Sequence, residues 1–357
     1  MAASTTFRCS SLSSACRLLF QKQTAGYRQL RFLSSSSQDN SASDAVSAAP
    51  ENEERDPFPV FVQPRVQELL TRITGFDLMK VAGPQKKPLQ RPIYKLMTDE
   101  QLNAELSSAK ERLQHRLQMP PYMKPRRPHL TPLSVDPELA GFDKSNYVFV
   151  DISFGVKDRK RSVVIREVDG TLRVAPWDVK ERMNQIYNPR EGRHVVKPSM
   201  FEEANLERMI SEKRYQYVLD RACCQFEPDD PDFIRTTHRV YNAVDQCGDY
   251  EHLRSTRHFG PLAFYLAWHS SIDGLLVDML DRDKAQDARD LVVLFADVHP
   301  DSSCAAAISE LPQQDDDVAV IKTYLATDCK NKDKVELSLR AMVDSQRSKG
   351  KTQNSSL

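Results

Sequence analysis

The sequence contains little glycine, and this scarcity argues against several classes of enzyme. Only 11 of the 357 residues are glycine, and they form neither a GxxxxGK[ST] loop nor a GxGxxG turn, the two common phosphate-binding patterns. The GxSxG nucleophile motif and the HExxH zinc motif are also missing. No apolar run approaches the roughly 20 residues of a membrane span. We therefore expect no enzymatic activity, no cofactor, no small-molecule substrate and no membrane span.

Cysteine is too sparsely placed to predict a metal site. Cys9 and Cys16 lie near the N-terminus, and the remaining five cysteines form an odd number with no CxxC pair, so neither zinc nor a disulfide framework is expected. We interpret these five as buried small hydrophobes: Cys223, Cys224, Cys247, Cys304 and Cys329. The acidic run at 315–317 could attract a metal, but its place at a predicted helix start favours an interaction with the helix dipole.

Acidic residues are absent from the first 33 positions, which carry five Lys or Arg and are rich in Ser, Ala and Leu. This composition is typical of a mitochondrial transit peptide; the alternative is a disordered basic tail. We expect residues 1–33 to be removed, with the mature chain starting near Ser34 and residing in the mitochondrial matrix. Residues 34–60 are polar and of low complexity, which predicts a disordered leader.

The charge balance limits the extent of any contact with nucleic acid. Without residues 1–33 the chain keeps 45 basic and 50 acidic side chains, a net charge of −5. Proteins that coat a phosphate backbone are usually strongly basic. The basic share lies in residues 141–200 (12 basic, 8 acidic), whereas residues 201–300 hold 11 basic and 19 acidic side chains. Any RNA contact should therefore be local.

Residues 61–145 combine helices with a proline-rich connector. Apolar residues at Val66, Leu69, Leu70 and Ile73, between Pro64 and Gly75, predict a short amphipathic helix. A second helix should begin at a capping box formed by Thr98 and Gln101, with one apolar face made by these residues: Leu102, Leu106, Ala109, Leu113 and Leu117. The prolines that follow exclude a helix or a central strand and indicate an extended basic connector.

Residues 146–200 read as a small antiparallel β-meander. Three runs rich in β-branched and aromatic residues follow one another, and Asp169-Gly170 between the last two is a strong hairpin signal, because a two-residue turn needs positive φ at both positions. The helix after them should cover one face of the sheet through Trp177, Met183 and either Ile186 or Tyr187.

Residues 201–346 are predicted to be helical, and residues 347–357 to be a disordered tail. Asp, Pro and Gly interrupt the pattern at short intervals, which indicates antiparallel helix pairs. The expected helices are 201–211, 213–226, 231–246, 249–269 with a kink near Gly260-Pro261, 273–281, 284–298, 316–327 and 333–346. The predicted class is α+β, mostly α: N-terminal helices and extended connectors, then a small β-meander, then a helical-pair domain.

Four groups of side chains are candidate contacts to RNA or to protein. Three are basic clusters, each of which taken alone is more often a solvated face: Lys124, Arg126 and Arg127; Arg159, Lys160 and Arg161; Arg190 and Arg193. The fourth is Arg254, Arg257 and His258, which would share one face of a helix. In an acidic region we favour an ion pair for this group, either within the chain or across an interface, over RNA phosphate. Pairing of His258 with Asp278 or Asp281 as an acid/base site is a weak alternative.

Several segments also resemble a known family. They occur in this order: YKLMT (94–98), YVFVDISF (147–154), DGTLR (169–173), QIYNPREGR (185–193), QFEPDD (225–230), LRSTRHFG (253–260), IDGLLVDML (272–280) and LFADVHPD (294–301). Over about residues 60–345 the chain is similar to the S22 family of animal mitochondrial small-subunit ribosomal proteins. The resemblance implies a structural, non-catalytic role among other mitochondrial small-subunit ribosomal proteins and the small-subunit rRNA. A helical adaptor of the matrix outside the ribosome, or an enzyme with an unfamiliar site, remains the alternative.

Overall fold

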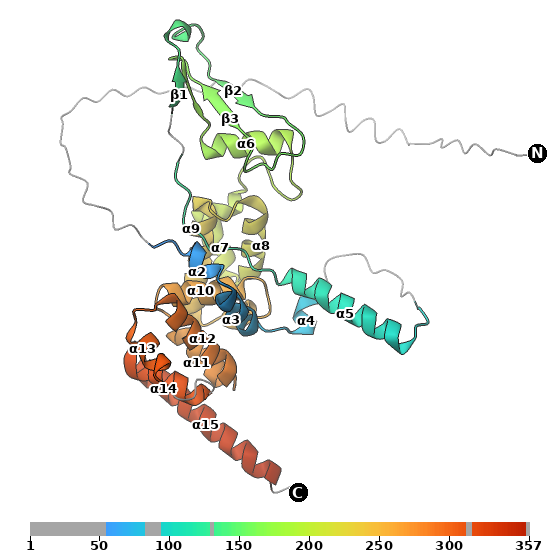
Figure 1. Cartoon of the computed structure of the whole chain (residues 1–357), viewed down its shortest axis with the longest axis vertical. Helices are drawn as coiled ribbons and strands as arrows, with labels where there is room; N and C mark the ends of the chain where they lie inside the picture. The colour runs from blue at the N-terminus through green and yellow to red at the C-terminus, as the bar shows by residue number, and fades with distance from the viewer. Residues whose placement is uncertain (1–54, 83–93, 129–131, 312–315, 355–357) are drawn as a thin grey trace, which may run out of the picture. The chain divides into compact units, whose positions relative to one another are not determined.

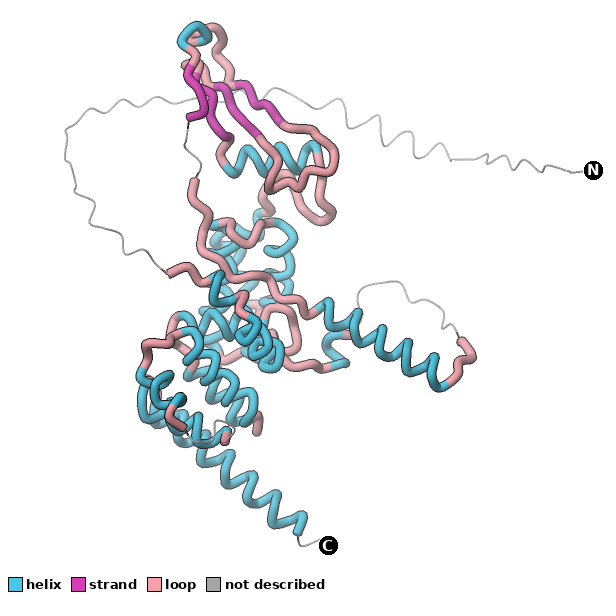
Figure 2. Tube along the Cα trace, viewed as in Figure 1, coloured by secondary structure: helices cyan, strands magenta, loops and turns pink. Residues whose placement is uncertain are grey.

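The computed structural model describes residues 55–82, 94–128, 132–311 and 316–354, with side chains described as far as residue 346 (Figure 1). The predicted presequence, and the leader before residue 55, lie outside the described residues. Helices dominate this part of the chain and four strands form one small sheet (Figure 2). The predicted α+β class, mostly α, is confirmed.

The first described element is a helix that the prediction had placed within a disordered leader. α2 (Phe58–Phe61) buries Val60 and Phe61 in the main core, so the disorder prediction is wrong for residues 58–60. α3 (Pro64–Thr74) forms as predicted: Pro64 lies in the first turn, and Gly75 follows the last residue with a φ of 70°. Its four predicted apolar residues are all buried.

Two further helices precede the sheet. α4 (Leu78–Val81) is a single turn, capped by the Asp77 carboxylate. α5 (Asp99–Arg116) starts at the predicted capping box, in which Thr98 and Gln101 each accept a hydrogen bond from the other's backbone N–H. None of the side chains of α5 is buried.

The sheet has four antiparallel strands in the order β1-β4-β3-β2. The three predicted strands are confirmed as β2 (Tyr147–Val150), β3 (Val163–Arg166) and β4 (Thr171–Val174). Sequence patterning missed β1 (Pro132–Val135), which is followed by the 3-10 helix η1 (Pro137–Leu139). β1 is an edge strand, where a proline without N–H is tolerated.

The β3–β4 hairpin forms at the predicted place with a different turn. Gly170 has a φ of 82°, whereas Asp169 is not among the residues with positive φ. The Gly170 N–H donates to the Glu167 carbonyl (3.1 Å), and the Glu167 N–H donates to the Thr171 carbonyl (2.9 Å). This is a three-residue loop with glycine at its left-handed position rather than a two-residue turn.

One sheet face is covered by α6 (Trp177–Tyr187), through Val179 and Met183 packed on Val163 and Ile165. Ile186 and Tyr187 are exposed, so their predicted role in this packing is wrong. No helix of the described part of the chain covers the opposite face. Strand register places Tyr147 and Phe149 of β2 beside Arg166 and Val164 of β3 on that face.

The helical part contains more breaks than the sequence suggested. Its elements are η2 (Ser199–Phe201), α7 (Glu203–Ser211), α8 (Tyr215–Gln225), α9 (Pro231–Cys247), η3 (Tyr250–His252), α10 (Phe259–Trp268), α11 (Asp273–Asp281), α12 (Ala285–Val298), α13 (Ser303–Ser309), α14 (Asp317–Thr327) and α15 (Lys332–Asn354). α13 was missed, and α15 continues through most of the predicted disordered tail. Asp316 caps α14 by accepting from Val318 and Ala319.

The predicted helix 249–269 is wrong in its middle. Residues 253–258 form turns, and Ser255 has a φ of 59°, outside the right-handed helical region. The Ser255 N–H donates instead to the carbonyl of Thr74 at the end of α3 (3.1 Å). Pro261 lies in the first turn of α10, where a missing N–H breaks no helical bond, and therefore produces no kink.

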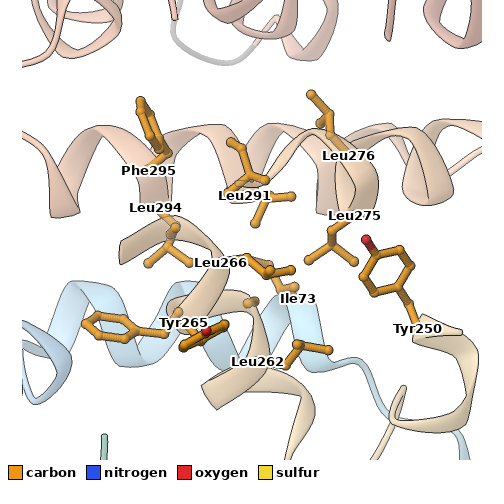
Figure 3. Packing of buried hydrophobic residues seen from close by; sticks show 14 of the residues in the cluster. Ile73, Tyr250, Leu262, Tyr265, Leu266, Leu275, Leu276, Leu291, Leu294 and Phe295 are labelled. Atoms are coloured by element: carbon orange, nitrogen blue, oxygen red, sulfur yellow. The ribbon is translucent and has the colours of Figure 1, made fainter. Parts of the chain in front are cut away.

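The main core joins α3 to the C-terminal helices. In Figure 3, Ile73 lies near Leu262 and Leu266 of α10 and near Leu291 and Leu294 of α12; all five are no more than 1% exposed. Part of the proline-rich connector also packs against this core, through Met119 and Tyr122. Local periodicity thus predicts the helices. The stability of α3 comes from its packing on helices that lie nearly 200 residues away in sequence.

Two of the five cysteines outside the predicted presequence are buried. Cys304 and Cys329 are buried as predicted, and burial raises the pKa of each thiol to about 11. Cys224 and Cys247 are exposed, so the prediction is wrong for them.

Among the described residues no single helix is long and apolar enough to cross a membrane, although the bent pair α12 and α13, taken together, meets that test in length and composition.

Candidate interaction surfaces

Arg126 lies at the centre of a partly buried ion-pair network. Its side chain is 9% exposed; Nη1 lies 2.5 Å from Glu181 on α6, and Nη2 lies 2.6 Å from Asp230 before α9. The guanidinium also lies over the ring of Trp177, 4.6 Å from its centroid. A desolvated arginine that binds two carboxylates and stacks on an aromatic ring makes its contacts within the chain.

Three more predicted contact residues belong to the same network. Arg159 lies 2.7 Å from Asp229. Arg190 and Arg193 share Glu227, at 2.5 Å and 3.0 Å. Arg190 also lies 2.6 Å from Asp158. We call the four arginines with their carboxylates the Arg126 network: Arg126, Arg159, Arg190, Arg193, Asp158, Glu181, Glu227, Asp229 and Asp230. It links the sheet and α6 to the loop between α8 and α9.

Burial has the largest effect on the pKa of two carboxyls in this network. Burial raises the pKa of the Glu181 and Asp230 carboxyls, even though Arg126 acts in the opposite direction. The arginines therefore offset part of the free-energy cost of burying the charged carboxylates. The network therefore has a structural role, because its guanidinium groups form ion pairs with carboxylates of the same chain.

Arg161 has a different structural role. Its side chain is buried (3% exposed) and donates to three backbone carbonyls, those of Asp151 (2.8 Å), Ser153 (3.0 Å) and Val156 (2.9 Å). The guanidinium therefore holds the loop between β2 and β3 in shape and satisfies carbonyl oxygens that strand pairing leaves free.

The group Arg254, Arg257 and His258 lies in turns rather than along one helix. Arg254 is 5% exposed, with carboxylates of Glu251, Asp278 and Asp287 at 3.5, 3.4 and 3.3 Å. Such a guanidinium is committed to intramolecular ion pairs. Burial raises the pKa of the Asp287 carboxyl against the opposing effect of Lys284 and Arg254.

Arg257 and His258 converge on one carboxylate, that of Asp220 on α8. Arg257 Nη2 lies 2.7 Å and His258 Nε2 lies 3.0 Å from Asp220 Oδ1. His258 is 1% exposed, and burial lowers its pKa although the hydrogen bond to Asp220 raises it. The weak alternative of an acid/base pair between His258 and Asp278 or Asp281 is wrong, because the His258 imidazole binds Asp220 instead, and Asp278 binds Arg254 and Arg282.

An open cleft of 820 Å³ lies beside these turns. Its lining is mixed in charge: Lys80, Val81, Arg116, Leu117, Gln216, Asp220, Glu251, His252, Arg254, Ser255, Thr256 and Arg257. Lys80 forms an ion pair with Glu251, and Arg257 one with Asp220. Most of its positive charge is therefore neutralised within the chain. No group of three or more His, Cys, Asp or Glu in the described residues could hold a metal ion.

Three predicted contact residues keep their charge free. Lys124, Arg127 and Lys160 are exposed, and their side chains make no ion pair or hydrogen bond with a described residue. Lys124 and Arg127 flank the buried Arg126, and Lys160 lies between Arg159 and Arg161. The sequence placed all of these in basic clusters, and the structure separates them by their partners: the side chains of Arg126, Arg159 and Arg161 bind groups of the chain, whereas those of Lys124, Arg127 and Lys160 do not.

A second free surface is the open face of the sheet. Tyr147 and Phe149 are 48% and 52% exposed on β2, and Phe154 in the following loop is wholly exposed. Sequence patterning found these strands and did not anticipate an apolar face without cover. The available signal was their composition: both faces of YVFV are apolar, whereas a sheet with one solvated face alternates polar and apolar residues.

These features define a class of protein: a mostly helical interaction protein. Its arginines form mainly internal ion pairs. Apolar surface and a few basic side chains remain available to partners. The chain belongs to the family described as mitochondrial 28S ribosomal protein S22, whose model matches residues 59–300. It is 42% identical over 282 residues to small ribosomal subunit protein mS22 of Mus musculus, covering 79% of this chain and 78% of the relative. The mS22 protein of Bos taurus is 41% identical over 283 residues, with the same coverage.

Proposed function

We propose that this chain is a structural component of the small subunit of the mitochondrial ribosome, located in the matrix and supporting mitochondrial translation. The observation that carries the proposal is family membership over residues 59–300, together with two relatives named as small ribosomal subunit proteins. The partners are other small-subunit proteins and, at a few positions, the small-subunit rRNA.

Protein contacts dominate in this proposal. The chain after residue 33 carries a net charge of −5, and eight of the eleven predicted contact side chains are engaged within the chain. The open sheet face with Tyr147 and Phe149 supplies the apolar and aromatic surface that protein interfaces favour. Local RNA contacts fall to Lys124, Arg127 and Lys160.

The proposal assigns no catalytic role, cofactor or small-molecule substrate to the chain. His258, which lies beside a carboxylate and an arginine, is buried and hydrogen-bonded to Asp220. A general acid or base must reach its substrate, and this imidazole does not reach solvent.

Gradient sedimentation of the tagged full chain from lysed mitochondria tests the proposal. We expect the chain to migrate with the small subunit, and to leave that fraction when ribonuclease dismantles the particle. Migration as a light species that ribonuclease does not change would contradict a ribosomal role and favour a matrix adaptor. The same gradient, repeated over a series of KCl concentrations, gives the salt at which half of the chain is released.

The RNA contacts are tested by a matched pair of triple variants. One removes the three free charges: Lys124→Ala, Arg127→Ala and Lys160→Ala. The control removes three exposed charges elsewhere: Arg208→Ala, Lys322→Ala and Lys334→Ala. Each phosphate contact contributes roughly 0.7–0.9 to the slope of log affinity against log salt, so the first variant should lose a slope of about 2 and the control almost none. Equal behaviour of the two would remove these residues from the RNA interface.

A further inference from the structure

The two edges of the small sheet differ in how they are protected against pairing with another strand. β1 carries Pro132, which has no N–H, and its register with β4 shifts between Pro132 and Ser134. Proline and an irregular register are two features by which natural sheets block an edge strand. β2, at the other edge (Figure 1), pairs with β3 in unbroken register and contains neither proline nor a charged residue. β2 is therefore the edge that remains open to another strand.

The hydrogen-bond pattern shows which main-chain groups of β2 face outward. The Asp151 N–H, directly after the strand, donates to the Ser162 carbonyl (3.0 Å) and so faces β3. Inward and outward groups alternate along an antiparallel strand, so every second residue before Asp151 also bonds β3. The N–H and C=O groups of Val148 and Val150 therefore point away from the sheet, and none of them bonds a described residue.

Side chains on both faces of β2 are exposed, which favours a strand over a helix as the occupant. Tyr147 and Phe149 are 48% and 52% exposed on the open face. Val148 is 39% exposed on the other face, where its strand partner Ile165 packs under α6. A helix laid on the open face would cover the two aromatic rings and leave Val148 and the outward main-chain groups in water. A strand beside β2 covers all of them, because its own side chains alternate between the two faces.

The charges around β2 argue against a phosphate backbone as the occupant. Asp143 and Asp151 lie before and after the strand, and Lys144 is the only basic residue between positions 141 and 156. Hydrogen bonds from neighbouring side chains and backbone groups lower the pKa of both carboxyls, so both are ionised at neutral pH. A strand with basic residues at its ends complements these carboxylates, whereas RNA phosphate is repelled by them.

We propose that β2 is the docking site for an extended segment of a neighbouring small-subunit protein, which adds a fifth strand to the sheet. The main chain of this segment hydrogen-bonds Val148 and Val150. Apolar side chains on one of its faces lie beside Tyr147 and Phe149, and basic residues at its ends pair with the flanking carboxylates. The choice of a neighbour rests on the proposed function: two copies paired edge to edge need a two-fold axis, and a ribosomal subunit is asymmetric.

Hydrogen exchange read at single amides tests the added strand on the unmodified chain. In the free chain the N–H groups of Tyr147 and Phe149 bond β3, and those of Val148 and Val150 face water. We expect exchange at Val148 and Val150 to slow at least about tenfold in the assembled subunit. Tyr147 and Phe149 are internal controls, because their amides are protected in both states. Exchange at Val148 and Val150 that stays as fast in the subunit as in the free chain would overturn the proposal.

Photo-cross-linking on the intact subunit identifies the occupant. Benzoylphenylalanine replaces Phe149, which keeps an aromatic ring beside the open edge. The control position is Leu133, 55% exposed on the protected edge strand β1. We expect the photo-reactive group at 149 to join one extended segment of one ribosomal protein, and the same group at 133 not to reach that segment. Products with rRNA, with a second copy of the chain or with a helix would each overturn the proposal.

Competition for incorporation measures what the outward main-chain groups contribute. Val148→Pro removes an outward N–H of β2. Val135→Pro is the matched control: the Asp136 N–H donates to the Gly170 carbonyl (3.1 Å), so the N–H of Val135 points away from β4 at the protected edge. Each variant is coexpressed with the unmodified chain. We expect Val148→Pro to be depleted about tenfold in the subunit fraction and Val135→Pro to be incorporated like the unmodified chain.

Equal incorporation of the two proline variants would overturn the docking site. Urea unfolding of each free variant shows whether the proline has disturbed the sheet itself. Should Val148→Pro lower the unfolding midpoint more than Val135→Pro, the exchange measurement decides, because it needs no variant. If the unmodified chain itself failed to sediment with the subunit, the proposed function would fail first.

Discussion

Replacing Arg126 by methionine should destabilise the chain through the carboxylates it leaves behind. Methionine keeps much of the volume and removes the charge. Glu181 and Asp230 would remain, with side chains 25% and 10% exposed and with their closest cation missing. Breaking a buried pair on one side costs about 3–5 kcal/mol. The partial exposure of Glu181 argues for the lower end, about 3 kcal/mol.

The penalty should depend on pH in a defined direction. Burial already raises the pKa of the Glu181 and Asp230 carboxyls, and loss of Arg126 raises both further. A carboxyl whose pKa is higher in the folded chain takes up a proton there first, which stabilises the folded chain as pH falls. The penalty is therefore complete at pH 7 and shrinks as the pH approaches 5.

Urea unfolding at pH 7 and pH 5 measures both effects. The control is Arg340→Met, which breaks an exposed pair with Glu336 and should cost less than about 0.5 kcal/mol at either pH. Adding Glu181→Gln to the Arg126 variant should recover at least about 1 kcal/mol, because one uncompensated charge disappears. A loss at pH 7 no larger than that of the control, or one independent of pH, would refute the structural reading of the network.

Three further changes test other parts of the fold. Burial, with a contribution from His269, lowers the pKa of His238 to about 4. The unfolded imidazole takes up its proton near pH 6.5, so the stability of the folded chain should fall as the pH drops from 6.5 to 4. In thermal melts the variant His238→Gln should show a weaker dependence of stability on pH over this range. Gly170→Ala puts a Cβ 2.1 Å from a backbone oxygen at a φ of 82°, whereas Gly141→Ala, at a φ of 73°, meets nothing within 4 Å; we expect the first to cost at least about 2 kcal/mol more in urea unfolding, and equal losses would argue against the close approach. Asp273→Ala removes the acceptor of the buried Tyr324 hydroxyl (2.6 Å) and of two backbone N–H groups; a loss below about 2 kcal/mol in the same assay would contradict this role.

Local signals predicted local structure well. The bounds of α3, the capping box of α5 and the position of the β3–β4 hairpin follow from periodicity and from hydrogen bonds between residues a few positions apart. The errors arise where a distant residue intervenes. The Thr74 carbonyl binds the Ser255 N–H and so interrupts a helix that local propensity favours. Pro132 forms a strand because β4 offers a partner and leaves the proline at the sheet edge.

The sequence by itself determined the class of the fold, the net charge of −5 after residue 33 and the family resemblance, since composition, periodicity and ordered motifs are properties of the linear chain. Only the tertiary structure decided which basic side chains are free. Arg126 meets Asp230 from 104 positions away, and Arg159 meets Asp229 from 70. An arginine between two other basic residues looks the same in sequence whether it faces solvent or a carboxylate. For Arg126 the packing of α6 and α9 makes that choice, because it brings Glu181 and Asp230 to a guanidinium that burial has removed from water.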